Sequence, residues 1–426
     1  MTDYIVGLDI GTTKIAAVVG RRAESGKIEI AGYGKTESLG VKRGFVSNIE
    51  LTIQSIQRAI KEAEENSNVE IKEVYVGIAG QYVKSIQQRG HYMKQVRDEE
   101  ITQDDIDKLT ASMYNLAINP GEQIIAVIPQ EYTIDGEPGI KEPVGMVGTL
   151  IETNFHVITA QIAAVRNIKK CVERAGLELK GLILEPIASS SAAVSEEEKE
   201  AGVALVDIGG GTTDIAIFQD GFLRHSSVIP FGGEVITEDI KEGCTIIKKY
   251  AEDLKVKFGS AMAVKNKEEE IVSIPGLRGR PPREISLKNL ASIIQARMEE
   301  ILEQVNFNIR NSGYEKKLIA GIIITGGGSL LKHIIQLTEY VTGKETRIGY
   351  PNEFLENGTD KELSNPIYST AVGLLKIGIE KAEEDELEAT HSGNDNTEEE
   401  QKPEIKDVKK KRRHLLDMFE SFLTSE

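Results

Sequence analysis

The chain has 426 residues, which is enough for two or more domains that each bury a core. A formal net charge of −17 argues against general binding of nucleic acid, and the only cysteines, Cys171 and Cys244, suggest neither a disulfide framework nor a zinc site. The N-terminus has no basic region followed by a long apolar segment, and no apolar run reaches the ~18 residues of a membrane span, so we expect a cytoplasmic protein whose membrane contact is at most peripheral.

The N-terminal stretch Tyr4–Gly20 predicts a β-hairpin, because two apolar runs flank the turn sequence Asp-Ile-Gly-Thr-Thr. A further strand pair is expected over Lys27–Ser38. A helix should follow Asn48, which is a plausible N-cap, and Glu73–Gly80 should form the next strand.

The segment Gln81–Ala160 repeats nothing elsewhere in the chain and is interpreted as an inserted subdomain. It contains a short amphipathic helix at Thr102–Asn115 and strands at Ile124–Thr133 and Leu150–Thr159. His156 falls in an alternating strand, which is more typical of a packed or surface side chain than of a ligand.

A strand leads into a helix at Leu182–Ala193, with Pro186 in the first helical turn. Glu185 would then lie at the carboxyl end of the strand, where ligands of open sheets gather. Two interpretations are open for it: it positions or deprotonates an attacking water, or it is simply an acid at a helix start.

The most informative stretch, Val203–Phe218, again predicts a hairpin whose turn holds three glycines. Gly209–Gly211 can adopt positive φ and bring backbone N–H groups close to an anion, and Thr212 and Thr213 add hydroxyl donors. Asp207 and Asp214 would repel a phosphate unless a divalent cation lies between. The turn is therefore interpreted as a phosphate cradle with Mg²⁺ near its carboxylates, the alternative being an ordinary glycine-rich hairpin.

The two hairpins are similar, and their aspartates Asp9 and Asp207 are separated by about half of the folded body. This spacing predicts a duplicated fold with a nucleotide held between the halves. Other phosphate-binding loops fit poorly, because the chain has no Gly-Lys-Ser/Thr P-loop ending and neither hairpin completes G-x-G-x-x-G before a helix.

Beyond the second hairpin, Lys248–Gly259 predicts an amphipathic helix with Glu252 and Lys255 one turn apart. Such a pair is usually a solvated ion pair, and the functional alternative is a contact with ribose or adenine. Further predictions are a loop at Ser273–Pro282 and a long helix at Leu287–Asn311.

The last predicted elements of the folded body are a glycine turn and a helix. Gly321–Leu331 reads as a buried strand that leads into a turn of three glycines and a helix, a pattern that suits close passage of backbone past a base or ribose. Asn365–Gly378 predicts a final helix with small residues on one side.

Residues 380–408 hold 12 Asp/Glu and 3 Lys/Arg, a composition typical of a disordered linker. The end of the chain pairs a basic cluster with the apolar face of a predicted helix. The basic cluster is Lys409, Lys410, Lys411, Arg412 and Arg413, and the apolar face is Leu415, Leu416, Met418, Phe419, Phe422 and Leu423.

A basic cluster directly before an apolar face favours an anionic membrane surface, at ~1 kcal/mol per Lys/Arg near the lipid. These eleven residues are therefore predicted to bind the membrane. Docking on the protein's own body or in a partner's groove is the alternative.

Five motifs together carry a family resemblance. DIGTTK (Asp9–Lys14), DIGGGTTD (Asp207–Asp214) and ITGGGSLL (Ile324–Leu331) resemble the two phosphate motifs and the adenosine motif of the actin-like ATPase superfamily, and LEPIASSSAA and NPIYSTAVG resemble its two connecting helices. The motifs occur in the superfamily's order across nearly all of residues 1–380. The resemblance implies ATP and Mg²⁺ bound between two ribonuclease H-like lobes.

The resemblance also implies roles for particular residues. Metal binding, through water, falls on Asp9 and Asp207. The candidate catalytic residues are Asp207 and, from its position at the end of a strand, Glu185. Nucleotide contacts fall on Gly11, Thr12, Thr13, Lys14, Gly209, Gly210, Gly211, Thr212, Thr213, Glu252, Lys255, Gly326, Gly327 and Gly328. Similar loops in related chaperones and sugar kinases mean that these motifs do not establish ATP turnover, so at most weak ATPase activity is expected.

Within the superfamily, the early insertion and the AEDLK segment resemble the FtsA family of bacterial cell-division proteins. This resemblance implies self-assembly into filaments, recruitment of the tubulin-like protein FtsZ and of later division proteins, and a peripheral location on the cytoplasmic face of the inner membrane at the division site. The alternatives are a PilM-like pilus-assembly adaptor of the same fold and a soluble phosphotransferase.

The predicted organisation is a two-lobed α/β fold of the duplicated actin-like type with an inserted α+β subdomain. The first lobe comprises residues 1–80 and 161–195, the insertion residues 81–160, and the second lobe residues 196–379 with a nucleotide-capping part at about 230–320. A disordered linker at 380–408 and an amphipathic helix at 409–426 complete the prediction.

Overall fold

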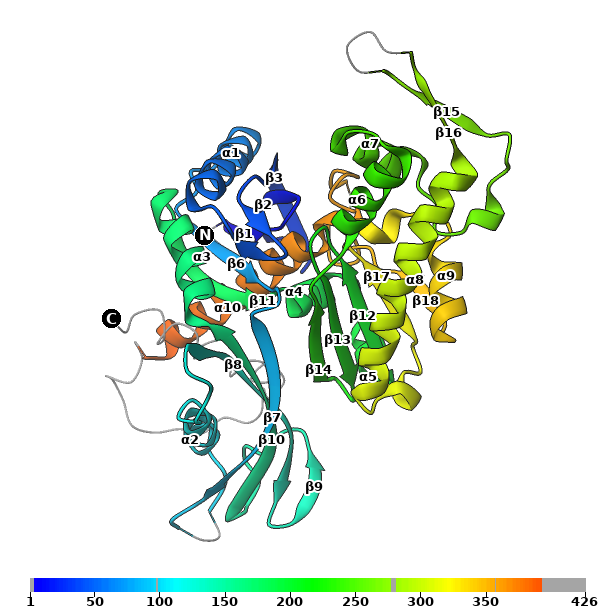
Figure 1. The fold of residues 1–426 in the computed structure, drawn as a ribbon. Helices are drawn as coiled ribbons and strands as arrows, with labels where there is room; N and C mark the ends of the chain where they lie inside the picture. The colour runs from blue at the N-terminus through cyan, green and yellow to red at the C-terminus, as the bar shows by residue number, and fades with distance from the viewer. Residues whose placement is uncertain (1–3, 97–98, 277–280, 357, 393–426) are drawn as a thin grey trace.

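A computed structural model describes residues 4–96, 99–276, 281–356 and 358–392 (Figure 1). The chain forms two lobes, each built on a five-stranded sheet, and two helices lie between the sheets. This is the duplicated α/β architecture that the two similar hairpins predict.

The sheet of the first lobe has the strand order β11-β6-β1-β2-β3. Its members are β1 (Ile5–Ile10), β2 (Lys14–Arg22), β3 (Ile28–Glu37), β6 (Glu73–Ile78) and β11 (Glu178–Leu184). The predicted strand pair at Lys27–Ser38 is wrong, because β3 is one strand that pairs with β2 from Ile28 to Glu37. A small hairpin of β4 (Val41–Lys42) and β5 (Phe45–Val46) precedes the helices of this lobe, α1 (Ile49–Ser67) and α3 (Ile162–Arg174).

The sheet of the second lobe has the order β14-β13-β12-β17-β18. Its strands are β12 (Val203–Ile208), β13 (Thr213–Gln219), β14 (Phe222–Ile229), β17 (Ile322–Thr325) and β18 (Thr346–Ile348). The strand arrangement of the first lobe recurs here. In each lobe three consecutive strands pair antiparallel, and a later strand pairs parallel to the first of them: β6 with β1 in the first lobe, and β17 with β12 in the second. This correspondence confirms the predicted duplication.

The outer part of the second lobe is mainly helical. It contains α6 (Gly233–Cys244), α7 (Lys248–Phe258), the 3₁₀ turn η1 (Ala263–Lys265), α8 (Leu287–Asn311) and α9 (Ile334–Thr342), while α5 (Glu196–Ala201) and η2 (Glu315–Lys317) lie nearer the sheet. A projecting hairpin of β15 (Ile271–Ile274) and β16 (Arg283–Ser286) contains Ser273 and Ile274, so the predicted loop at Ser273–Pro282 begins too early (Figure 1).

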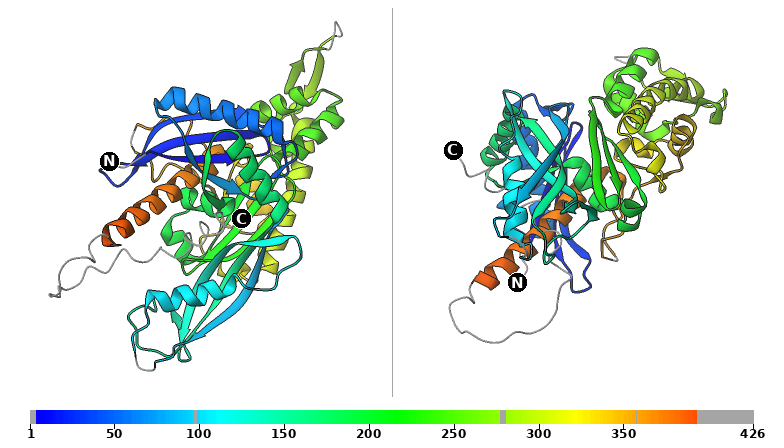
Figure 2. Two further views of the ribbon diagram at one scale, coloured as in Figure 1. Left: turned by 90° about the vertical axis from the view of Figure 1, so that its left-hand side faces the viewer. Right: turned by 90° about the horizontal axis from the view of Figure 1, so that it is seen from below.

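Two connecting helices, α4 (Glu185–Ala193) and α10 (Ser369–Ser392), pack on each other between the lobes (Figure 2). They meet backbone to backbone, since a Cβ on Gly373 of α10 would lie 1.8 Å from the carbonyl oxygen of Ala188 in α4. The 3₁₀ turn η4 (Pro366–Tyr368) leads into α10.

The helix α10 continues well past Gly378, where the sequence pattern placed its end. Its continuation is fastened to the first lobe, because the Arg22 guanidinium donates to both carboxylate oxygens of Glu383 at 2.9 and 3.1 Å. Residues 380–392 are therefore helical, and the predicted linker begins too early. The rest of that linker and the predicted helix at 409–426 lie outside the described residues.

The insertion forms a four-stranded sheet of order β7-β10-β8-β9 with one helix (Figure 1). Its elements are β7 (Val83–Met93), α2 (Gln103–Met113), β8 (Glu122–Ile134), β9 (Glu137–Ile140) and β10 (Leu150–Gln161). It has its own core, in which Leu109 and Phe155 are almost fully buried. His156 is buried beside the Ser85 hydroxyl, at 3.0 Å from Nε2, as expected of a packed side chain.

The insertion contacts the second lobe through Arg224 of β14, whose side chain is 5% exposed. Its guanidinium donates to Gln130 at 3.1 Å and to Glu131 at 2.7 Å, both on β8, while Asp220 lies at 3.2 Å. The insertion thus connects in sequence to β6 and α3 of the first lobe, whereas its β8 is hydrogen-bonded to the second lobe. Within the described residues, no helix is both long enough and apolar enough to span a membrane.

Candidate functional site

The turns of the two similar hairpins face each other where the lobes meet. A Cβ on Gly210 would lie 2.3 Å from Thr13 Cγ2, and one on Gly211 would lie 2.3 Å from Thr12 Oγ1. These distances are far below van der Waals contact, so only glycine allows the turns to approach so closely. The structure therefore brings together the two motifs for which the sequence predicts phosphate contacts.

The helical part of the second lobe is joined to the β12–β13 turn by backbone hydrogen bonds. Gly233 N–H donates to Gly209 O at 2.8 Å, and Glu234 N–H donates to Gly210 O at 2.7 Å. The N-terminus of α6 therefore abuts the turn and adds its positive helix dipole there. Such an arrangement favours an anion at the turn.

Glu252 and Lys255 of α7 also belong to this region. Lys255 Nζ lies 2.8 Å from Glu252 Oε2, so the predicted ion pair is present. The same ammonium donates to Gly233 O and to Thr237 Oγ1, each at 2.8 Å. Lys255 thus supports the backbone that holds the β12–β13 turn.

The third glycine turn lies against the end of β12. Gly326 has φ of 77°, and a Cβ there would lie 2.2 Å from Asp207 Oδ1. A Cβ on Gly328 would lie 2.3 Å from Ile208 Cγ2, while Gly327 has only Ile367 nearby, at 3.8 Å. The turn continues as the 3₁₀ helix η3 (Gly327–Leu330) before α9. Gly326 and Gly328 are thus required by close packing, and Gly327 is the roomier position.

Four carboxyl groups gather at these strand ends: Asp9, Glu185, Asp207 and Asp214. Burial, with a smaller contribution from the Asp207 carboxylate, raises the pKa of Asp214 to about 8. Burial likewise raises the pKa of Asp207, and burial together with the three aspartates raises that of Glu185 well above its usual range. Among the described residues, Lys14 supplies positive charge to this cluster, and its ammonium pairs with Asp9. The cluster is therefore short of positive charge.

The residues present fit a hydrated magnesium ion. Asp214 Oδ1 is buried without a hydrogen-bond partner, and the absence of a Cβ at Gly210 and Gly211 leaves the backbone N–H groups of that turn unshielded beside Thr12 and Thr13. No group of three or more His, Cys, Asp or Glu side chains in the described part of the chain is placed to ligate a metal. Mg²⁺ commonly keeps several waters and takes few protein ligands, so Asp9 and Asp207 suit contact through water.

Several other predicted residues have defined partners. Gly11 lies in the β1–β2 turn, where a Cβ would lie 2.9 Å from Lys14 O. Thr12 Oγ1 accepts from Gly44 N–H at 3.0 Å, and Thr212 Oγ1 donates to Asp214 at 3.0 Å. Thr213 differs from expectation, because its buried hydroxyl donates to Phe231 O at 3.0 Å and so braces the backbone near α6.

The predicted membrane-binding residues all lie outside the described residues, which end at Ser392. Membrane binding therefore stays a prediction for both parts of this segment. The basic part is Lys409, Lys410, Lys411, Arg412 and Arg413, and the apolar part is Leu415, Leu416, Met418, Phe419, Phe422 and Leu423.

Sequence reasoning gave no role to Ser189 and Thr370. The Ser189 hydroxyl donates to Asp207 Oδ2 at 2.6 Å, and the Thr370 hydroxyl lies 3.3 Å from the same oxygen. Both residues fall inside the two segments that resemble connecting helices, so the segments were visible in the sequence. Their contact with Asp207 was not, because it depends on how α4 and α10 cross.

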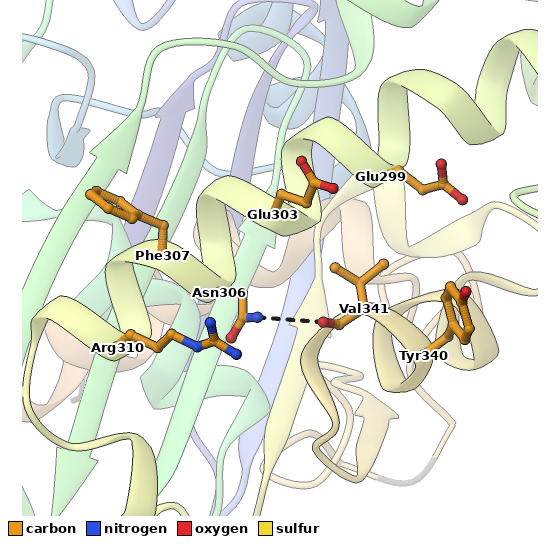
Figure 3. A pocket seen from close by; sticks show the side chains of 7 residues that line it. All are labelled: Glu299, Glu303, Asn306, Phe307, Arg310, Tyr340 and Val341. Carbon is orange, nitrogen blue, oxygen red and sulfur yellow. Dashed lines mark hydrogen bonds between the residues drawn. The ribbon is translucent and has the colours of Figure 1, made fainter.

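A surface pocket lies elsewhere, between α8 and α9 on the second lobe (Figure 3). It is lined by Glu299, Glu303, Asn306, Phe307, Arg310, Tyr340 and Val341, and the Asn306 amide donates to Val341 O at 3.4 Å. None of the residues predicted to contact nucleotide lines this pocket.

Comparison with known proteins gives consistent matches over most of the chain. The family model described as "Cell division protein FtsA" matches residues 204–373, and that described as "SHS2 domain inserted in FTSA" matches residues 80–159. A cell-division protein FtsA from Pseudomonas aeruginosa is 42% identical over 377 residues, covering 88% of this chain and 89% of the relative. That from Escherichia coli K12 is 38% identical and covers 88% of this chain and 90% of the relative.

Solved structures share the fold at low identity. A PilM–PilN complex of type IV pilus biogenesis superposes with a TM-score of 0.64 at 15% identity, covering 89% of this chain and 99% of that one. MreB5 of Spiroplasma citri bound to ADP gives 0.53 at 16% identity, covering 91% and 99%. A chain of the MamK double helical filament gives 0.50 at 13% identity, covering 88% and 98%. These likenesses confirm the actin-like fold.

Proposed function

The chain belongs to the FtsA family of cell-division proteins, and from that premise we propose that it binds ATP, polymerises, and tethers FtsZ filaments to the cytoplasmic membrane. We further propose that it recruits later division proteins to the division site. The observation that carries the nucleotide part is the contact of Gly210 and Gly211 with Thr13 and Thr12 of the opposite turn, beside a group of buried carboxyls. A PilM-like role rests on likeness of fold alone, at 15% identity.

In the proposed site, the β1–β2 and β12–β13 turns hold the phosphates from opposite sides. Backbone N–H groups of the glycine turns and the dipole of α6 supply positive potential. Lys14 supplies a positive charge among the carboxyls through its ion pair with Asp9. When a hydrated cation binds, it would take the place of Lys14 beside Asp9. Bound Mg²⁺ would neutralise phosphate charge, with Asp9 and Asp207 holding its waters.

Glu185 is the residue proposed to position or deprotonate water. It begins α4 at the carboxyl end of β11, and its Cγ lies 2.8 Å from where a Cβ on Gly77 would be. Burial and the three nearby aspartates raise its pKa well above the usual range, which favours the protonated acid when no cation is bound. A weak ATPase at most is proposed, since this acid must lose its proton to act as a base.

Isothermal titration calorimetry of the full chain with ATP in magnesium buffer tests the nucleotide part. We expect saturable binding to wild type, and a large loss of affinity for Gly211→Val, whose side chain would overlap Thr12. Ser190→Ala is the control, because the Ser190 hydroxyl donates to Ile187 O and contacts neither turn. A valine at Gly176 would not serve, since Gly176 has φ of 93° and the substitution would strain the backbone. Absence of binding heat for wild type with both ATP and ADP would refute the proposal.

Membrane attachment is proposed for the C-terminal segment. Five consecutive basic residues, Lys409–Arg413, precede six apolar residues between Leu415 and Leu423, which a helix would place on one face. One such helix binds reversibly, so polymerisation would strengthen attachment by presenting many copies at once. Flotation with liposomes of anionic and of neutral lipid should show binding to the anionic ones, lost on deletion of residues 409–426. Unchanged flotation of the deletion variant would contradict the proposal.

Polymerisation is supported by the fold shared with MreB5 and the MamK filament, and sedimentation with and without ATP tests it. We expect ATP to increase the pelleted fraction. A phosphotransferase would instead stay in the supernatant and consume ATP only with a small acceptor molecule.

A further inference from the structure

We propose that Ser189 and Thr370 are positioning residues for the magnesium–nucleotide complex, acting on Asp207 from the two connecting helices. The inference rests on the proposed function, since it concerns the same nucleotide site. It gives a role to two residues for which the motifs predict none, and it links the site physically to the crossing of α4 and α10.

The geometry divides the two oxygens of Asp207 between different surroundings. Oδ2 accepts the Ser189 hydroxyl at 2.6 Å and lies 3.3 Å from the Thr370 hydroxyl, and the two hydroxyl oxygens are themselves 3.0 Å apart. Oδ1 faces Gly326, the first glycine of the third turn. The hydroxyls therefore fix the carboxylate rotation that directs Oδ1 toward the glycine turn.

These hydrogen bonds depend on an unusually close crossing of helices. Ser189 is fully buried and Thr370 is 9% exposed. They come within hydrogen-bond distance because Gly373 lets the backbone of α10 touch the backbone of α4 at Ala188. A shift of one helix relative to the other would lengthen at least one of the three contacts, and so would alter how Asp207 is held.

The corresponding aspartate of the first lobe is held differently. Asp9 pairs with Lys14 of its own hairpin, only five positions away. Asp207 instead depends on residues 18 and 163 positions away. Within the described residues, the helices that join the lobes therefore hold Asp207, whereas Asp9 is held within its own hairpin.

Removing a hydroxyl should affect the cation more than the nucleotide itself. Hydrogen bonds donated to a carboxylate fix its orientation, and the waters of a cation must meet carboxylate oxygens at fixed places. Ser189→Ala leaves Oδ2 with one donor fewer in a buried position. Loss of a supporting hydrogen bond around a metal site typically weakens affinity by about tenfold or more.

Calorimetry with ATP in magnesium buffer and with ATP in EDTA tests this. For Ser189→Ala we expect affinity about tenfold below wild type in magnesium and within about twofold of wild type in EDTA. Ser190→Ala is the matched control, because this neighbouring hydroxyl donates to Ile187 O within α4 at 2.8 Å and not to Asp207. The control should bind as wild type does in either buffer.

A second pair of variants keeps the test valid should Ser189→Ala fold poorly. Thr370→Val removes the hydroxyl with little change of shape, whereas Thr370→Ser keeps it. We expect the valine variant to lose magnesium-dependent affinity and the serine variant to retain it.

The outcomes separate this inference from the proposed function. Wild-type binding together with unchanged affinities of Ser189→Ala and Thr370→Val, or equal losses with and without magnesium, would overturn the positioning role while leaving nucleotide binding intact. Absence of wild-type binding would overturn the proposed function and this inference with it.

Discussion

Replacing Gly373 by alanine should destabilise the protein, although the position lies inside a helix. A Cβ there would lie 1.8 Å from Ala188 O, 2.4 Å from Ala188 C and 3.0 Å from Ala188 Cα. All three atoms are backbone, so no rotamer change relieves the overlap. The helices α4 and α10 must instead separate by more than 1 Å to restore ordinary contact, which starts near 3.4 Å.

Two opposing effects set the magnitude. Alanine is favoured over glycine in a helix interior by about 1 kcal/mol. Overpacking in a core usually costs about 1–3 kcal/mol, and the cost is highest where backbone has to move. We therefore expect the free energy of unfolding to fall by about 2 kcal/mol, which corresponds to a decrease of several degrees in melting temperature.

Thermal and urea unfolding of the full chain, followed by circular dichroism, measure this change. Gly243→Ala is the matched control, because Gly243 lies in α6 and its nearest neighbours are only the flexible tip of Ile293, at 2.8 and 3.5 Å. The control should change stability by less than about 1 kcal/mol. A Gly373→Ala protein as stable as wild type would show that the two helices separate easily, contrary to the packing described.

Three further predictions concern other parts of the molecule. Burial lowers the pKa of His156 to about 4, below its usual 6.5, so the unfolded chain binds more protons than the folded one between these pH values. Urea unfolding at pH 7 and at pH 5 should therefore show about 2 kcal/mol less stability at pH 5. His156→Gln should not show this loss. Arg224→Ala should speed hydrogen exchange in β8, because the buried guanidinium no longer binds Gln130 and Glu131. Mass spectrometry measures this exchange, and Arg347→Ala, at an exposed ion pair with Glu198, should leave the exchange of β8 unchanged. Lys255→Met should weaken ATP binding in calorimetry by about tenfold, since a charge-assisted bond to Gly233 O is lost beside the β12–β13 turn, whereas Lys257→Met on the same helix should not.

Local sequence signals predicted most of the fold. Asn48 caps α1 by accepting from Leu51 N–H at 3.1 Å, and Thr102 and Asp105 form the capping box of α2. These are contacts between residues three positions apart, which a sequence pattern records directly. The hairpin prediction for Val203–Phe218 is confirmed for the same reason, because both strands and the turn lie within one short stretch.

Contacts between distant residues explain what sequence reasoning missed. The acidic composition after residue 380 is typical of disorder, yet α10 continues because Glu383 meets Arg22, 361 positions away. The roles of Ser189 and Thr370 likewise depend on a helix crossing that no local pattern encodes. For the candidate site, the sequence predicted which turns meet, whereas the detailed partners of Thr213 and Asp207 needed the structure.

The length of α10 gives it mechanical leverage. Its 24 residues span roughly 36 Å from Thr370, beside Asp207, to the end from which the C-terminal segment continues. Because Arg22 holds α10 against the first lobe through Glu383, we expect α10 to move with the first lobe when the lobes rotate relative to each other. A turn of about 10° about the helix crossing at Gly373 would move the far end by about 5 Å, because roughly 28 Å of helix lies beyond the crossing. A small change in the angle between the lobes would thereby move the end of α10 by more than the width of a water molecule.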